Sequence, residues 1–101
     1  MTDSDRVEVT ITAPDPDWLI DLCRKLVDAR LASSAHIIHA ITSIYRWESA
    51  IHETTEARAS LRSRVDLLDA LAAYVVERHS YDVPHVTAVP IAGGNPDYLA
   101  W

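Results

Sequence analysis

The chain has few of the residues on which several common classes of protein depend. Its 101 residues include one cysteine (Cys23), one lysine (Lys25), two glycines and no phenylalanine. A single cysteine excludes an intrachain disulfide framework and a multi-cysteine zinc site, and it fits a reducing compartment. Nine basic residues against fifteen acidic ones give a formal net charge of −6. That balance argues against nucleic acid or a membrane surface as partner, because both need clustered Lys and Arg.

Segments that direct proteins into or across membranes are also missing. The start, MTDSDRVEV, has no basic region followed by an apolar one, so we expect no signal peptide. No apolar run approaches the ~18 residues that a transmembrane helix needs. The composition, 49% hydrophobic and 24% charged, is that of one ordinary globular domain. We therefore expect a single cytoplasmic domain over residues 1–101, with residues 1–5 as a flexible lead-in.

Residue spacing predicts the elements of the first half. Val7, Val9 and Ile11 alternate with polar residues, as in a strand with one buried face. Asp15-Pro16 is typical of a helix start. The apolar stripe expected on that helix is Trp18, Leu19, Leu22, Cys23, Leu26 and Val27.

A long hairpin, a second helix and a last strand are predicted in the second half. Residues 32–47 contain no glycine or proline and predict one strand, bent near His39-Ala40. Residues 48–49 form a turn, and residues 50–62 return as a strand. Ser63 resembles a hydroxyl cap for a helix that ends near His79. Its expected buried face is Val65, Leu68, Leu71, Ala72 and Val75. A strand over residues 86–91, a loop at residues 93–96 and a short C-terminal helix follow.

This order predicts an α+β fold, the ferredoxin-like β-α-β-β-α-β sandwich, with two helices on one face of an antiparallel sheet. A strand of about sixteen residues is roughly 50 Å long, whereas a domain of this size has a radius of gyration of about 13 Å. The hairpin that carries Ile44, Tyr45 and Trp47 should therefore project beyond its own core. An exposed aromatic tip is normally buried by a partner chain, so we expect a homo-oligomer.

The residues that could carry chemistry are mainly histidines and glutamates. G-x-G-x-x-G, Walker A, G-x-S-x-G and H-E-x-x-H patterns are all absent, so we expect no enzyme. His36 and His39 are secondary metal candidates, because residues three apart on a strand chelate one ion only if a bulge intervenes. Glu56 and His79 could meet where the second helix packs over the sheet, and would then offer two ligands to a divalent transition metal. A surface salt link between these two residues is the alternative.

Three ordered motifs closely resemble those of the CutA family, the divalent-cation tolerance proteins. They are TSIYRWE at residues 42–48, HSYDVP at residues 79–84 and YLAW at residues 98–101. The family's strings are T-S-I-Y-x-W-E, H-x-Y-x-x-P and Y-L-x-W. The resemblance runs from about Val7 to Trp101, in matching order and spacing.

The resemblance implies a tight homotrimer in which strands of one subunit extend the sheet of the next. It also implies a role in tolerance of copper and other divalent cations, with Glu56 and His79 at the positions most often linked to metal contact. Ser34 stands where the family often has cysteine. Because serine is a poor ligand for Cu(I), we expect weak binding of Cu(II) or Zn(II) instead.

Three functional hypotheses follow from the sequence. The first is a cytosolic homotrimer that binds a divalent metal weakly, at Glu56 and His79, and contributes to the response to metal ions. The second is a PII-like trimeric sensor of a small anionic ligand or a partner protein. The third is a stable structural trimer with no retained ligand. The second hypothesis places the ligand in a cleft between subunits lined by Tyr45, Trp47, Arg62 and Tyr81.

Overall fold

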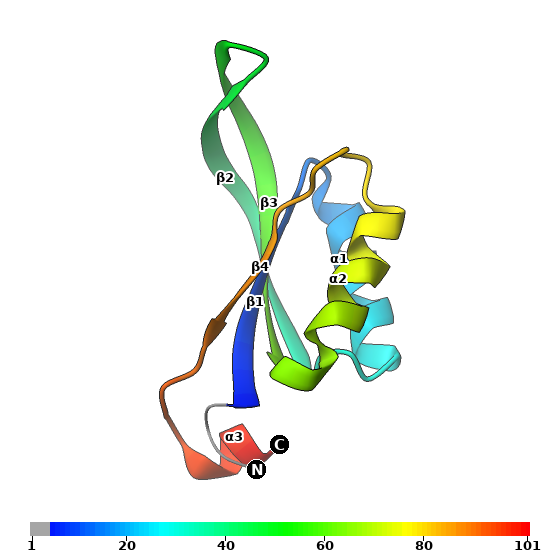
Figure 1. The fold of residues 1–101 in the computed structure, drawn as a ribbon, viewed down its shortest axis with the longest axis vertical. Coiled ribbons are helices and arrows are strands. Elements are labelled where there is room, and N and C mark those ends of the chain that lie inside the picture. The colour runs from blue at the N-terminus through cyan, green and yellow to red at the C-terminus, as the bar shows by residue number, and fades with distance from the viewer. Residues whose placement is uncertain (1–4) are drawn as a thin grey trace.

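The computed structural model describes residues 5–101 as a four-stranded antiparallel sheet with helices against one face (Figure 1). The strands are β1 (Arg6–Ala13), β2 (Ser34–Trp47), β3 (Ala50–Arg64) and β4 (Val86–Pro90). The helices are α1 (Pro16–Asp28), α2 (Leu68–Arg78) and the short α3 (Pro96–Ala100), and a 3-10 turn, η2 (Val65–Leu67), precedes α2. The predicted order of strands and helices is confirmed. The predicted lead-in, residues 1–5, lies outside the described residues apart from Asp5.

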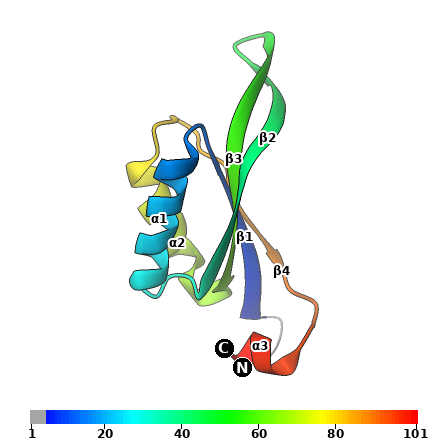
Figure 2. The same cartoon turned by 180° about the vertical axis from the view of Figure 1, so that it is seen from behind.

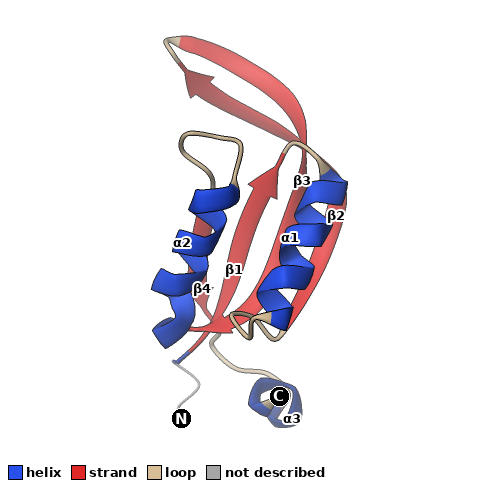
Figure 3. Cartoon of the chain, turned by 90° about the vertical axis from the view of Figure 1, so that its right-hand side faces the viewer, coloured by secondary structure: helices blue, strands red, loops and turns tan. Residues whose placement is uncertain are grey.

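The core lies between the sheet and the two longer helices. The strands follow the order β2-β3-β1-β4, and α1 and α2 cover the same face of the sheet (Figure 3). Alternate residues of β1 and β3 point into this layer, so the predicted period of two is confirmed. The main core residues are Val7, Val9, Ile11, Leu19, Leu22, Cys23, Leu26, Ala57, Ala59, Leu61, Leu71 and Val75.

Of the two predicted helix caps, the structure contains only the one at Asp15. Asp15 caps α1 as predicted, because its side chain accepts a hydrogen bond from the backbone N–H of Asp17 at 3.0 Å. The predicted cap at Ser63 is wrong, since β3 continues to Arg64 and the helix begins only after η2. The Ser63 hydroxyl is buried and donates to the carbonyl of Leu31 at 2.7 Å. Val65, expected inside, is consequently exposed.

The β2–β3 hairpin projects beyond the helix-covered part of the sheet, as its length predicted (Figures 1 and 2). The molecule measures 44 × 25 × 23 Å along its principal axes. At the tip, Glu48 and Ser49 both adopt positive φ angles, of 51° and 66°, which suits the tight two-residue turn. Ile44 and Ile51 near the tip are 67% and 68% exposed. The hairpin therefore presents apolar surface that its own chain does not cover.

A β-bulge interrupts β2 at the predicted bend. Ile38 pairs with Arg58 and Ile41 with Glu56, so two residues of β2, His39 and Ala40, stand opposite a single residue of β3. One extra residue reverses which side chains of the strand face each side of the sheet. Beyond the bulge, the odd-numbered residues of β2 share a face with Glu56.

None of the helices within residues 5–101 is long and apolar enough to span a membrane.

Candidate functional site

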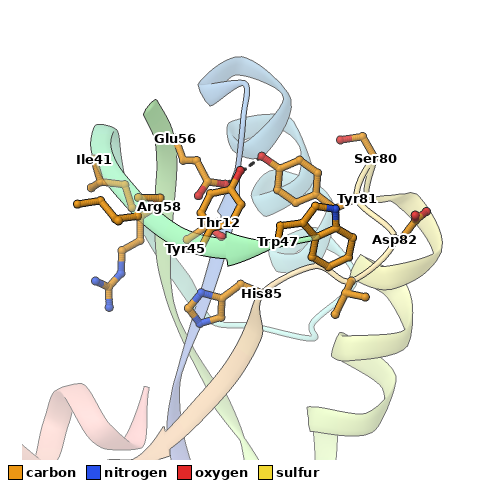
Figure 4. Close-up of a pocket in the computed structure, with 13 residues that line it drawn as sticks. Thr12, Ile41, Tyr45, Trp47, Glu56, Arg58, Ser80, Tyr81, Asp82 and His85 are labelled. Atoms are coloured by element: carbon orange, nitrogen blue, oxygen red, sulfur yellow. Dashed lines mark hydrogen bonds between the residues drawn. The ribbon is translucent and has the colours of Figure 1, made fainter. Parts of the chain in front are cut away.

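A cleft of about 770 Å³ lies where the projecting hairpin meets the loop between α2 and β4. Its walls include Thr12 of β1, Tyr45 and Trp47 of β2, Glu56 of β3 and Tyr81 of the loop (Figure 4). The β-bulge places Tyr45 and Trp47 in this cleft, because it puts their side chains on the same face of the sheet as Glu56. Clefts of several hundred Å³ are the usual size of small-ligand sites.

Glu56 is the buried acidic group of the cleft. It is 7% exposed, and its Oε2 accepts a hydrogen bond from the Tyr81 hydroxyl at 3.1 Å (Figure 4). No Lys, Arg or His side chain within residues 5–101 forms an ion pair with Glu56. Buried carboxylates are normally paired or bind a cation, because removing an unpaired charge from water is costly. Glu56 is therefore a candidate cation ligand.

Tyr81 lies next to this carboxylate and responds to its charge. Burial raises the pKa of Tyr81 to about 12, helped by the hydrogen bond to Glu56 and by the negative charges of Glu56 and of ionised Tyr45. A phenolate beside a carboxylate is unfavourable, so the phenol keeps its proton and continues to donate. The Tyr81 phenol is thus held in a donor role over the pH range of ordinary experiments.

His79 ends α2, and both of its ring nitrogens are used within the chain. Nδ1 accepts a hydrogen bond from the backbone N–H of Tyr81 at 3.0 Å, and Nε2 lies 2.8 Å from the carbonyl oxygen of Thr12. A carbonyl only accepts, so Nε2 carries the proton and donates. The ring also packs edge-on against Trp18 at 5.2 Å between centroids. His79 therefore anchors the loop that carries Tyr81.

The predicted pair, Glu56 and His79, meets through Tyr81 rather than directly. Both contact that residue, and the alternative salt link between them is not formed among the described residues. Within one chain, the two therefore do not present a ready two-ligand metal site. Their role as metal ligands stays a prediction.

The secondary candidates, His36 and His39, lie away from the cleft. His36 pairs with Ser60, and His39 falls in the bulge itself. Metal binding by His36 and His39 stays a prediction. Among residues 5–101, no three His, Cys, Asp or Glu side chains are grouped so that they could hold a metal ion.

The predicted cleft residues are only partly brought together. Tyr45, Trp47 and Tyr81 share the cleft, but Arg62 lines a different cavity, of about 420 Å³, near α3. The Arg62 side chain is buried there. It donates to the hydroxyl of Ser33 at 2.8 Å and to the carbonyl of Tyr98, and its guanidinium lies 4.4 Å from the centre of the Tyr98 ring. Within one chain, Arg62 holds α3 in place and does not reach the cleft.

The cleft members that sequence reasoning missed include Thr12, Asp82 and His85. Thr12 contributes its backbone carbonyl to His79, and no side-chain pattern reports such a contact. Asp82 and His85 flank Val83-Pro84, inside or next to a motif already noted. Their loop position next to Tyr81 is the one signal that could have drawn attention to them.

Comparison with known protein families matches residues 7–101 to the family described as CutA1 divalent ion tolerance protein. The chain is 38% identical to a Protein CutA homolog of Xenopus laevis over 91 residues, which are 90% of this chain and 60% of that protein. It is 36% identical to the divalent-cation tolerance protein CutA of Thermus thermophilus, covering 92% of this chain and 90% of that one. The chain thus spans about half to three-fifths of the length of the eukaryotic relatives and most of the bacterial one.

Solved structures agree with this assignment. The CutA1 structure from Oryza sativa superposes with a TM-score of 0.93 at 35% identity, covering 99% of this chain and 93% of that chain. The structure of a divalent cation tolerance protein from Thermus thermophilus has a TM-score of 0.92 at 34% identity, covering 95% and 93%. The family match and these similarities extend over nearly the whole chain. The chain belongs to the CutA1 divalent ion tolerance family.

Proposed function

We propose that this chain acts as a non-catalytic, cytoplasmic homotrimer that binds Cu(II) or Zn(II) weakly and contributes to tolerance of divalent metal ions. The observation that carries the proposal is Glu56, a buried carboxylate without a cationic partner in the described chain. Family membership supports the tolerance role, because relatives are named as divalent-cation tolerance proteins.

The donor set around Glu56 explains why binding should be weak. A carboxylate is a suitable ligand for a divalent ion, and the Tyr81 phenol next to it is a second oxygen. His79 becomes available only if one of its ring nitrogens gives up its hydrogen bond to Thr12 or Tyr81. Metal binding through His79 therefore competes with the contacts that hold the loop.

The hairpin supports the trimer. Ile44 and Ile51 expose large apolar surface near the tip. Long exposed strands with apolar side chains are normally covered by another chain, because their free edges otherwise promote aggregation. A second and a third copy of this chain are the partners that we propose.

Titration calorimetry with Cu(II), Zn(II) and Cu(I) tests the metal site. We expect Glu56→Gln to abolish or strongly weaken Cu(II) and Zn(II) binding, because it keeps the shape of the side chain and removes its charge. His79→Ala should weaken binding as well, and His36→Ala serves as the control histidine outside the cleft. Unchanged affinities in Glu56→Gln would overturn the metal site.

No specific observation favours either alternative hypothesis. The anion sensor relied on Arg62, which in one chain lies beside α3. The ligand-free scaffold relied on Ser34, whose hydroxyl lies 3.4 Å from that of Tyr98. Ser34 does not line the Glu56 cleft. A serine at this position, where the family often has cysteine, therefore removes no metal ligand from this site.

A further inference from the structure

We propose that the Glu56 cleft also binds a compact organic ammonium ion, whose charge lies near Glu56 and whose carbon groups contact the aromatic walls. The inference rests on the cation site proposed above and adds a second class of ligand to it. Three aromatic side chains line the cleft, Tyr45, Trp47 and Tyr81, and a small metal ion makes no use of their ring faces.

Two of the three aromatic rings, those of Tyr45 and Tyr81, are held in position before any ligand arrives. Tyr45 stacks on His52, with 5.5 Å between ring centroids and 16° between planes. Tyr81 is fixed by its hydrogen bond to Glu56 and packs against the His79 ring at 4.8 Å. Figure 4 shows the Trp47 indole on the same side of the cleft as the Tyr81 ring. Rings that are already ordered cost little further entropy when a ligand binds.

The chemistry of such a wall favours a soft organic cation. The face of an aromatic ring attracts a positive charge within about 6 Å of its centre, and aromatic cages are a common device for recognising quaternary ammonium groups. A nearby carboxylate strengthens that attraction. The cleft combines both features, since Glu56 and the three rings line the same volume.

The charges of the cleft also favour a cation over an anion. Glu56 and Asp82 line it together with one arginine, Arg58. In Figure 4 the Arg58 guanidinium points away from the Glu56 carboxylate, and Arg58 forms no ion pair with it. Only one oxygen of Glu56, Oε2, accepts a hydrogen bond from residues 5–101. The other carboxylate oxygen remains available to an incoming cation.

Choline and its neutral carbon analogue, 3,3-dimethylbutan-1-ol, provide a matched test with the full chain. The two probes share shape and hydroxyl group and differ in charge. We expect choline to bind at least about tenfold more tightly, measured by NMR titration of its methyl signal. Glu56→Gln should remove most of this preference. Trp47→Leu should weaken choline binding by about threefold to thirtyfold, and Trp101→Leu, at the other end of the molecule, is the control tryptophan.

The outcomes separate this inference from the proposed function. Equal affinity for the two probes, or a choline affinity that Trp47→Leu leaves unchanged, would overturn the ammonium site. Zn(II) is titrated into the same unaltered protein. Zn(II) binding without choline binding would overturn only this inference, and choline binding without Zn(II) binding would overturn only the metal proposal. Size-exclusion chromatography and circular dichroism of each variant identify any loss of assembly or fold.

Discussion

Tyr81 connects the two residues with the best claim to metal chemistry. Its hydroxyl donates to Glu56, and its backbone N–H donates to His79. A change at Glu56 therefore reaches His79 through one residue of the α2–β4 loop. Sequence proximity explains the Tyr81–His79 contact, whereas the contact with Glu56 depends on packing between the loop and β3.

The raised pKa of Tyr81 should make stability depend on pH in the alkaline range. In the unfolded chain the phenol ionises near pH 10, whereas in the folded chain its pKa is about 12. The folded state then holds its proton more tightly, so this contribution is complete below pH 10 and is lost as the pH rises through 12. Urea unfolding between pH 9 and 12 should show a decline that is smaller in Tyr81→Phe. An equal decline in that variant would contradict the assignment, and Tyr74→Phe is the control.

Cys23 should be unreactive in the folded protein. It is 2% exposed, and burial raises the pKa of its thiol to about 11. Since the thiolate is the reactive form, we expect no labelling by Ellman's reagent at pH 8 without denaturant and complete labelling in 6 M guanidinium chloride. Fast labelling of the native protein would contradict the burial of α1 against the sheet.

The elements of the core could be predicted because local patterns determine them. Alternation at Val7, Val9 and Ile11 marks β1, and Asp15-Pro16 marks the start of α1. Ser63 misled the prediction because it has the chemistry of a helix cap but is buried in β3, where Leu31 supplies an acceptor. A serine hydroxyl can form hydrogen bonds equally well at a helix start and in a buried strand. Only the packing of the folded chain determines which of the two positions Ser63 occupies.

Less of the candidate site could be predicted than of the fold. The irregular pattern at His39-Ala40 indicated a bend, but which residues it turns toward Glu56 follows from the pairing register. The backbone carbonyl of Thr12 and the distant position of Arg62 leave no trace in the sequence. Motif resemblance and position along the chain predicted the candidate residues Glu56, His79, Tyr45, Trp47 and Tyr81. Only the structure shows which of them are in contact.

The cap at Asp15 should contribute measurably to stability. Its side chain satisfies a backbone N–H at the start of α1, so Asp15→Ala should lower the free energy of unfolding by about 0.5–2 kcal/mol. Chemical denaturation measures the change. Asp28→Ala, at the opposite end of α1, is the matched control, because the Asp28 side chain accepts no hydrogen bond from any described residue. A larger loss in Asp28→Ala would contradict the capping role.

At the scale of the whole molecule, the exposed hairpin predicts assembly. We expect light scattering to give a particle of about three times the chain mass of 11.3 kDa. Ile51 is 68% exposed near the tip, and Ile51→Asp should shift the particle toward the mass of one chain, because the charge would be buried in the interface.

Val76 provides a control on a different surface. It is 52% exposed on α2, so Val76→Asp should leave the native mass unchanged. A single-chain mass for the unaltered protein, or an unchanged mass in Ile51→Asp, would contradict a trimer held by the hairpin.

Anomalous scattering from crystals soaked in Zn(II) or Cu(II), recorded at the absorption edge of each metal, tests the central claim most directly. We expect a peak about 2.0–2.2 Å from a carboxylate oxygen of Glu56, next to Tyr81. The same peak should be missing in Glu56→Gln crystals. Two results would contradict a metal site in this cleft. One is a set of peaks confined to other surfaces, and the other is no peak at metal concentrations that fill the site in the solution titration.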